Sequence, residues 1–246
     1  MPSGDKLYEG KAKILYAMDD PALVTQYFKD DATAFNAQKR GTIVDKGVVN
    51  NRVSSALFAY LERQGVATHF VKQLDERSML VKRLEIVPLE VTIRNITAGG
   101  MAKLLGIEEG IVLSTPVFEW HYKSDALGDP LINDDHILAM GWATAEELAH
   151  IRAESFEVND ALKHFFRERR IDLVDFKLEF GRVIGQDGKP TAQIVLGDEI
   201  SPDTMRLWEQ GTRRKLDKDR FRRDLGSVEE AYQEVLRRVL GEAVTR

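Results

Sequence analysis

The chain has 246 residues, of which 43% are hydrophobic and 30% are charged, a composition typical of a globular protein. The net charge of −5 argues against a general nucleic-acid-binding surface, and the absence of cysteine excludes disulfides, thiolate zinc sites and a thiol nucleophile. No apolar run approaches the roughly 18 residues that a membrane helix needs, and the first residues lack the apolar core of a secretory signal. We therefore expect a soluble, cytoplasmic protein with neither a membrane nor a nucleic acid as partner.

The first 84 residues predict a small lobe that mixes strands and one helix. Five short strands are expected, two of them on either side of Gly10 within 6–18 and the others at 23–28, 68–72 and 79–82. A helix is predicted over 46–63, because apolar side chains recur on one face from Val49 to Leu61 and Gly65 follows as a stop. We assign residues 1–84 to this N-terminal α+β lobe and residues 85–246 to a second domain.

The second domain begins with a strand in which apolar and polar residues alternate from Leu89 to Arg94, as expected where one face is buried. The remaining elements are expected, in chain order, as a helix at 101–105 closed by Gly106, a strand at 118–123, a long loop at 124–135, a long helix opened by a capping box at Thr144, and an amphipathic helix at 228–240. Long loops in compact domains often carry function.

A predicted hairpin at 174–198 has the clearest chemical character. In its first strand, from Val174 to Phe180, apolar residues alternate with Asp175, Lys177 and Glu179. A turn at 186–190 leads to a second strand, which brings Asp198 to the level of Glu179. Two facing carboxylates repel each other unless a cation lies between them, and hard oxygen ligands beside a lysine suit Mg²⁺ that bridges nucleotide phosphates. A charged hairpin that faces solvent would show the same pattern.

Two other groups of residues could bind phosphate. Lys11 and Lys13 lie on one side of a strand just after Gly10, where the backbone can approach a ligand closely, although solvated lysines on an exposed strand edge would look the same. Arg94 precedes a pair of glycines and a helix start, a combination that suits a phosphate monoester or, alternatively, a plain turn with a surface arginine.

The remaining charged segment and the histidines give no clear indication of a functional site. The charges at 215–223 alternate in sign, and we interpret most of them as a solvated helix surface. The five histidines, at positions 69, 121, 136, 150 and 164, have no spacing typical of metal ligands and are interpreted as surface or packing residues.

Taken together, seven stretches of the chain resemble the phosphoribosylaminoimidazole-succinocarboxamide synthase (SAICAR synthetase) family of de novo purine biosynthesis. They are LYEGKAKILY (7–16), VVNNRVSS (48–55), VPLEVTIRNITAGG (87–100), DALGDPLINDDHI (125–137), DFKLEFG (175–181), GDEISPDTMRLW (197–208) and KLDKDRFRRDLG (215–226). DFKLEFG and GDEISPD are the specific signals. The stretches occur in order over almost the whole chain.

The resemblance implies a SAICAR synthetase-like α+β fold, with an antiparallel, kinase-like N-terminal lobe and a C-terminal domain related to ATP-grasp enzymes. It also implies an ATP-dependent ligase that joins L-aspartate to the carboxylate of carboxyaminoimidazole ribonucleotide (CAIR), giving SAICAR, ADP and phosphate. A carboxylate does not react with an amine at neutral pH because oxide is a poor leaving group. Transfer of the γ-phosphoryl group of ATP would give an acyl phosphate that the amine can attack, with Mg²⁺ and lysines offsetting charge on the transferring oxygens. A homodimer is expected for the family.

Matching positions imply a role for each candidate residue. The residues expected to bind ATP are Lys11, Ala12, Lys13, Lys82, Glu90, Glu179 and Asp198, and Glu179 and Asp198 are also expected to hold Mg²⁺. The residues expected to bind the other substrates are Arg94, Gly99, Gly100 and Arg206 for the CAIR phosphate and Arg220 and Arg222 for aspartate. The residues expected at the reacting groups are Lys177, Lys123 and Asp129.

One departure from the family concerns Gly100, where other members commonly have serine, whose hydroxyl can bond the ribonucleotide phosphate. Two other classes of function remain as alternatives. A kinase-like phosphotransferase would act on a hydroxyl, but the chain lacks a kinase catalytic-loop motif. A non-catalytic nucleotide-binding protein would need neither Lys177 nor Glu179, so the intact pair speaks against it.

Overall fold

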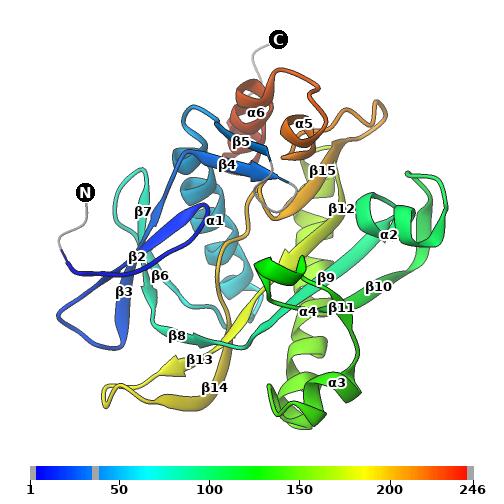
Figure 1. The fold of residues 1–246 in the computed structure, drawn as a ribbon. Helices are drawn as coiled ribbons and strands as arrows, with labels where there is room; N and C mark the ends of the chain where they lie inside the picture. The colour runs from blue at the N-terminus through cyan, green and yellow to red at the C-terminus, as the bar shows by residue number, and fades with distance from the viewer. Residues whose placement is uncertain (1–3, 35–38, 243–246) are drawn as a thin grey trace.

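The computed structural model describes residues 4–34 and 39–242, and it combines antiparallel sheets with helices (Figure 1). One five-stranded sheet has, in spatial order, the strands β1 (Lys6–Glu9), β2 (Lys13–Ala17), β3 (Leu23–Phe28), β7 (Ser78–Lys82) and β6 (Phe70–Gln73). A second has β11 (Leu131–Ile132), β10 (Val112–Tyr122), β9 (Leu89–Ile96), β12 (Ile171–Leu178) and β15 (Met205–Glu209). A three-stranded sheet has β14 (Pro190–Leu196), β13 (Phe180–Ile184) and β8 (Leu84–Ile86), and β4 (Asp31–Ala34) pairs with β5 (Lys39–Thr42).

Helices of very different length connect these strands. They are α1 (Lys46–Arg63), α2 (Gly99–Leu105), the 3-10 helix η1 (Asp125–Leu127), α3 (Asp134–Ala139), α4 (Ala145–Glu168), α5 (Asp219–Arg222) and α6 (Val228–Leu240). The start of α4 is fixed by a capping box, in which the Thr144 hydroxyl accepts from the Glu147 amide and the Glu147 carboxylate accepts from the Thr144 amide. Both α1 and α6 begin and end where their apolar periodicity predicts.

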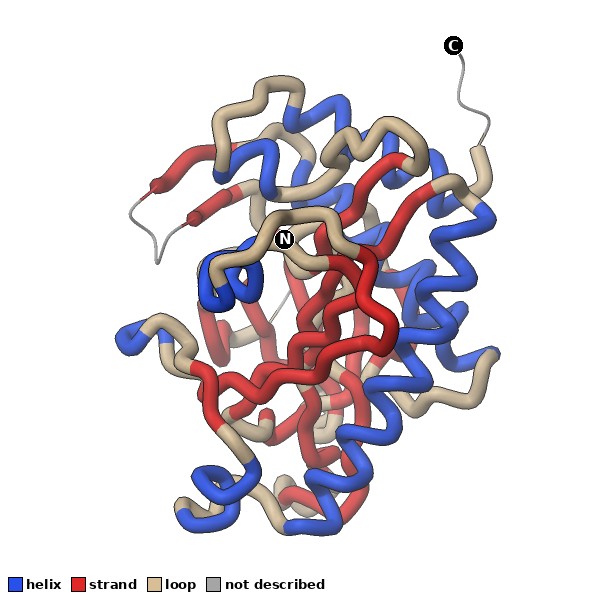
Figure 2. The backbone as a smooth tube through the Cα atoms, turned by 90° about the vertical axis from the view of Figure 1, so that its right-hand side faces the viewer, coloured by secondary structure: helices blue, strands red, loops and turns tan. Residues whose placement is uncertain are grey.

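The two large sheets pack against helices and enclose a common apolar core. Helix α1 packs on β3 and β6 of the first sheet and also against α6, while α4 packs on β9 and β12 of the second sheet. Figure 2 shows the strands in the middle of the molecule, with helices along their right-hand side. Antiparallel sheets covered by helices confirm the predicted α+β class.

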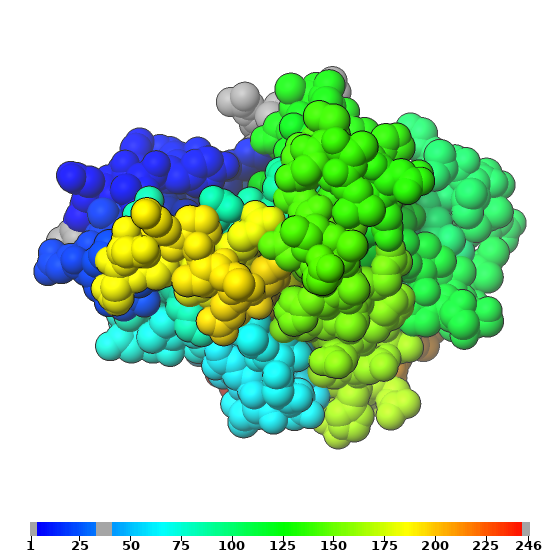
Figure 3. All heavy atoms as spheres, turned by 90° about the horizontal axis from the view of Figure 1, so that it is seen from below, coloured from blue at the N-terminus to red at the C-terminus, as the bar shows by residue number. Residues whose placement is uncertain are grey.

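The three-stranded sheet lies where the chain passes between the two large sheets. Its strand β8 follows β7 of the first sheet and precedes β9 of the second, and β13 follows β12 directly. Figure 3 shows the β13–β14 hairpin (yellow) between the N-terminal residues (blue) and the middle of the chain (green). The predicted domain boundary after residue 84 falls inside β8, and the division of the chain into 1–84 and 85–246 stays a prediction.

Several predicted elements differ from the structure. The strand expected over 174–180 is interrupted at Glu179, so that β12 pairs with β9 in the second sheet while β13 pairs with β14 in the third. The expected loop at 124–135 contains η1, β11 and the start of α3. The interpretation of 215–223 as a solvated helix is wrong, because only Asp219–Arg222 is helical and Asp217 and Asp219 are almost fully buried. None of the helices in the described part of the chain combines the length and apolarity that crossing a bilayer requires.

Candidate active site

A cleft of about 670 Å³ lies where the first sheet, the three-stranded sheet and the long 123–129 segment meet. One wall is apolar and is lined by Leu15, Val24, Val81, Leu84 and Ile86. The rest is polar and contains eleven of the predicted site residues, namely Lys11, Ala12, Lys13, Lys82, Glu90, Lys123, Asp129, Lys177, Glu179, Asp198 and Arg222. An apolar wall beside a strongly charged floor can take a ligand with a flat ring at one end and phosphates at the other.

The two predicted metal carboxylates come together at the floor of this cleft because of strand register. Phe180 of β13 pairs with Leu196 of β14, so Glu179 and Asp198 lie just beyond the end of that pairing. The Gly197 amide donates to the Glu179 carbonyl oxygen at 2.9 Å, which fixes the separation of the two backbones. The prediction that the hairpin brings Asp198 level with Glu179 therefore agrees with the geometry, although β13 rather than β12 provides the pairing.

Two lysines face these carboxylates from different parts of the chain. The Lys13 ammonium, from β2, contacts Asp198 and lies 3.1 Å from Glu199, and the Lys123 ammonium lies 2.5 Å from Glu179. Burial alone would lower the pKa of both lysines, but the carboxylates around them, Asp198 above all for Lys13 and Glu179 for Lys123, hold each pKa above its usual range. Both ammonium groups are therefore charged at neutral pH.

The carboxylates themselves are affected in opposite directions. Burial, together with the nearby charge of Asp198, raises the pKa of Glu179 to about 7 against the opposing effect of Lys123 and Lys13. Burial also disfavours the charged form of Asp198, but Lys13 and Lys123 outweigh it and hold the pKa of Asp198 below its usual range. The charge of Asp198 thus disfavours the charged form of Glu179, and a divalent cation between the two carboxylates would offset this effect.

The two carboxylates suit Mg²⁺, which takes part of its ligands from water and substrate. They are too few to hold a metal whose ligands all come from the protein. Within residues 4–34 and 39–242 no group of three or more His, Cys, Asp and Glu side chains is arranged to hold a metal ion. Mg²⁺ usually binds one or two carboxylates and completes its shell with water and substrate phosphates. Glu179 and Asp198 fit that pattern, and the backbone bond from Gly197 to Glu179, which brings the two acidic residues together, is the observation that favours a cation there.

The opposite rim of the cleft is held by ion pairs. Lys177 of β12 pairs with Glu90 of β9, and the exposed Lys11 ammonium reaches Asp125 of η1 at 2.6 Å. Lys11 and Asp125 both line the cleft, so this pair joins two of its segments that are 114 residues apart in the sequence. Asp129 adopts a left-handed backbone conformation with φ of 51°, and its carboxylate accepts from the Ser124 amide at 2.9 Å.

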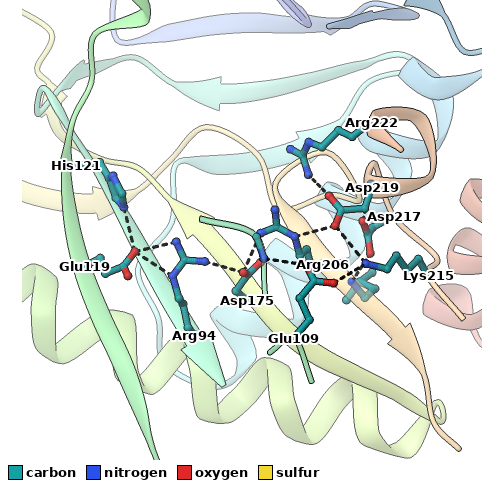
Figure 4. Close-up of polar contacts among 12 residues, drawn as sticks. Arg94, Glu109, Glu119, His121, Asp175, Arg206, Lys215, Asp217, Asp219 and Arg222 are labelled. Carbon is teal, nitrogen blue, oxygen red and sulfur yellow. Dashed lines mark hydrogen bonds and ion pairs between the residues drawn. The ribbon is translucent and has the colours of Figure 1, made fainter. Parts of the chain in front are cut away.

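The predicted phosphate-binding arginines lie beside the cleft rather than among its lining residues. Arg94 and Arg206 share the carboxylate of Asp175, each at 2.8 Å, because β9 and β15 flank β12 (Figure 4). The chain of charges continues from Arg94 to Glu119 at 2.8 Å and from Arg206 to Asp219 at 3.0 Å (Figure 4). Burial opposes the charge on Arg206, but Asp175 and Asp219 hold its pKa above the usual range.

The two glycines at the start of α2 adjoin these arginines but differ in the space around them. A Cβ at Gly99 would lie 2.3 Å from Arg206 Nη2, and Gly99 has φ of +52°, so this position requires glycine. At Gly100 the nearest atom to a Cβ is Arg94 Nη2 at 3.7 Å, which is ordinary van der Waals contact. Arg94, Gly99, Gly100 and Arg206 therefore form one cluster, as predicted, and Gly100 leaves room there.

The two arginines predicted for aspartate are separated. The Arg222 guanidinium lines the cleft and donates to Asp219 at 2.7 Å, which links the cleft to the arginine cluster. Arg220 instead donates to the carbonyl oxygens of Gly226 at 2.7 Å and Leu225 at 3.0 Å, and it is not among the residues that line the cleft. Its guanidinium closes the loop after α5.

Sequence reasoning missed several polar residues of this region. Asp175, Glu119 and Asp219 organise the arginines, and Gln26 and Lys218 line the cleft. The alternation of charge at 215–223 was the available signal for Lys218 and Asp219, but it is also typical of a solvated helix. No local signal pointed to Gln26, which reaches the cleft only because β3 is the central strand of the first sheet.

Comparisons with known proteins agree with this geometry. A family model described as SAICAR synthetase matches residues 6–239. The phosphoribosylaminoimidazole-succinocarboxamide synthase of Clostridium acetobutylicum is 57% identical over 241 residues, which cover 98% of this chain and 100% of that protein. The protein of the same name from Chloroherpeton thalassium is 58% identical over 241 residues, with 98% and 100% covered.

Solved structures give the same result. The crystal structure of the phosphoribosylaminoimidazole-succinocarboxamide synthase from Ehrlichia chaffeensis matches with a TM-score of 0.92 and 44% identity, covering 98% of this chain and 100% of that one. A SAICAR synthetase in complex with ADP matches with a TM-score of 0.89 and 42% identity, covering 97% and 99% of the two chains.

Proposed function

Since the chain belongs to the SAICAR synthetase family, we propose that its cleft joins L-aspartate to CAIR at the expense of ATP, giving SAICAR, ADP and phosphate in purine biosynthesis. One observation supports this assignment above the others. Glu179 and Asp198 lie together at the floor of the cleft, and two charged lysines, Lys13 and Lys123, face them. Phosphoryl transfer needs this combination of carboxylates for a metal and cations for the transferring oxygens.

The nucleotide is proposed to lie with its base on the apolar wall and its phosphates toward Lys11 and Lys13. Both lysines and Ala12 line the cleft, as does Lys82, whose ammonium donates to the Thr68 carbonyl oxygen at 2.9 Å. Mg²⁺ held by Glu179 and Asp198 would neutralise charge between the β- and γ-phosphates. The Lys13 ammonium would then give up part of its contact with Asp198 and bind phosphate oxygens.

The ribonucleotide is proposed to bind with its 5′-phosphate at the arginine cluster. Arg94 and Arg206 already share one carboxylate, Asp175, so a phosphate would receive guanidinium groups whose positions are fixed. Guanidinium forks match phosphate oxygens in pairs. The Gly100 amide in the first turn of α2 adds a donor, whereas the Gly99 amide donates to Glu109 at 3.2 Å. The carboxylate of CAIR would then point toward Lys123, Asp129 and Lys177 in the cleft.

We propose that catalysis proceeds through an acyl phosphate. The carboxylate oxygen of CAIR attacks the γ-phosphorus, the bond to the β-phosphate oxygen breaks, and ADP leaves. The amine of aspartate then attacks the acyl carbon, loses a proton and expels phosphate. Lys123 and Lys177 are proposed to stabilise the negative charge that gathers on these oxygens, and Arg222 is proposed to bind a carboxylate of aspartate.

A coupled assay tests this function. ADP release is measured from Mg-ATP and CAIR with and without L-aspartate, while the absorbance of the amide product is followed. The proposal expects product only when all three substrates are present. ADP release without aspartate and without amide would instead indicate a phosphotransferase or an ATPase. The proposal also includes a cytoplasmic homodimer, as expected for the family, and light scattering of the purified protein tests the dimer.

A further inference from the structure

Asp198 has an unusual backbone for a residue proposed to hold a metal. Its φ is 57°, in the left-handed region that residues with a Cβ seldom adopt. The preceding Gly197 is bonded through its amide to the Glu179 carbonyl oxygen at 2.9 Å, so the chain turns sharply after the end of β14. This turn directs the Asp198 side chain toward Lys13 and Glu179 instead of continuing the strand.

A buried glutamine of the first sheet holds this turn. Gln26 lies on the central strand β3, between Leu15 of β2 and Met79 of β7, and only 3% of its surface is exposed. Its side-chain amide donates to the Asp198 carbonyl oxygen at 3.1 Å, across a sequence separation of 172 residues. A polar amide inside a sheet is costly unless it is bonded, so this contact ties the two segments together.

The bond from Gln26 acts on the backbone of Asp198, whereas the contact with Lys13 acts on its side chain. Lys13 and the neighbourhood of Glu179 constrain the side chain of Asp198, whereas Gln26, beside a backbone hydrogen bond from His69, constrains its carbonyl group. Because a peptide plane rotates as a unit, release of the carbonyl would let the left-handed turn relax and move the carboxylate. The backbone of Asp198 is therefore held from the first sheet, and its side chain is oriented as a result.

We propose that Gln26 is a positioning residue that orients the Asp198 carboxylate for the Mg²⁺–nucleotide complex. This inference rests on the proposed function, since it assigns Gln26 to the same cleft. Gln26 acts through the backbone of Asp198, so we expect its loss to weaken nucleotide binding in the presence of the metal. Without metal, a nucleotide can still contact the lysines and the apolar wall, and the Gln26 amide bonds to Asp198 and not to these groups.

The test compares ADP binding by calorimetry with excess Mg²⁺ and with EDTA in the intact protein. Gln26→Met keeps the length of the side chain and removes the donor. We expect its affinity for ADP with Mg²⁺ to fall by about 3- to 10-fold, the loss of one hydrogen bond, and its affinity in EDTA to match the wild type. Gln26→Leu serves as a second variant, and thermal unfolding shows whether each variant is folded.

Gln73→Met is the matched control. Gln73 lies on β6 of the same sheet and its side-chain amide also donates to a carbonyl oxygen, that of Asp75 at 2.9 Å, but it is exposed and does not line the cleft. Its ADP affinity should not change under either condition.

Three results would overturn the inference. Unchanged Mg²⁺-dependent affinity in folded Gln26→Met and Gln26→Leu would show that the bond does not orient Asp198. An equal loss with and without Mg²⁺ would show that Gln26 contacts the nucleotide or only shapes the cleft. Equal ADP affinity of the wild-type protein with Mg²⁺ and with EDTA would contradict the proposed metal site itself. This measurement is made on the wild type, before any variant is compared.

Discussion

At the scale of single residues, Glu179 is a carboxylate whose charged form its surroundings disfavour, because burial and Asp198 both raise its pKa. The substitution Glu179→Gln keeps the size of the side chain and leaves the pattern of buried residues unchanged. We expect kcat to fall by about 100-fold or more while the protein remains folded, since a neutral amide is a poor ligand for Mg²⁺. ADP release in the three-substrate assay measures this.

The control for Glu179→Gln is Glu85→Gln, which removes an exposed carboxylate of β8 that pairs with Arg182 at 3.0 Å outside the cleft. It should leave kcat unchanged. Near-normal activity in Glu179→Gln would remove this residue from the metal site, and an unfolded variant would show that its role is structural.

The adjacent glycines at the start of α2 give a second prediction. Gly100→Ser places a hydroxyl in open space beside Arg94, and we expect the KM for CAIR to fall by about 2- to 10-fold because the phosphate gains a hydrogen bond. Gly99→Ala should have the opposite effect, since its Cβ would displace the Arg206 guanidinium and require φ of +52° from alanine. Steady-state kinetics at saturating ATP and aspartate compare the two. If Gly100→Ser leaves the KM unchanged, the missing hydroxyl has no role.

At the scale of secondary-structure elements, β10, β9, β12 and β15 are joined across one face by alternating charges. Burial would raise the pKa of Glu119, but His121 and Arg94 hold it at about 2, and Arg206 and Arg222 likewise hold the pKa of Asp219 at about 2 against burial. A pKa below the unfolded value stabilises the fold above that value. This stabilisation is therefore complete above about pH 5 and is lost as the pH falls toward 2.

Acid unfolding of a Glu119→Gln variant tests this contribution. The drop in pKa from 4.5 to about 2 corresponds to about 3 kcal/mol of unfolding free energy at most. We expect the variant to be less stable than the wild type at pH 7 and to lose less stability between pH 5 and pH 2. Glu146→Gln, on the exposed first turn of α4, is the control and should follow the wild type. Parallel curves for Glu119→Gln and the wild type would contradict the assignment.

Helices and strands that are determined by their own local sequence could be predicted. The bounds of α1, α6 and β3 agree with the sequence to the residue because apolar periodicity and stop signals act locally. The interruption at Glu179, the strand β8 and the ribbon β4–β5 were missed because each depends on a partner strand elsewhere in the chain. The pairing of Glu179 with Asp198 could be predicted because the hairpin joins them directly. The bond from Gln26 to Asp198 could not, since only the packing of the sheets brings them together.

At the scale of the whole molecule, a buried ion pair joins distant parts of the chain. Lys46, at the start of α1, lies 2.9 Å from Asp203, and the Tyr232 hydroxyl of α6 donates to the same carboxylate at 2.6 Å. Lys46 is fully buried, and Asp203 also contacts Lys218 at 3.3 Å on the edge of the cleft. The stability of the fold and the shape of the cleft therefore depend on the same carboxylate.

We expect Lys46→Met to lower the free energy of unfolding by about 3 kcal/mol, because it removes one partner of a buried charge, while Lys218 and Tyr232 remain. Tyr232→Phe should cost about 1 kcal/mol, the value of a single hydrogen bond. Urea unfolding followed by circular dichroism measures both. A loss smaller for Lys46→Met than for Tyr232→Phe would show that Asp203 is held mainly from α6 and not from α1.

The packing of α6 on α1 also constrains how the chain reaches its fold during synthesis. Proteins emerge from the ribosome with the N-terminal part first, and that part of a chain often folds before the rest is made. Here α1 is synthesised early, but the helix that covers it begins only at Val228. A nascent chain that stops short of Val228 exposes apolar surface that belongs inside the core. The apolar face of α1 that packs on α6 therefore stays uncovered until almost the whole described chain has been translated.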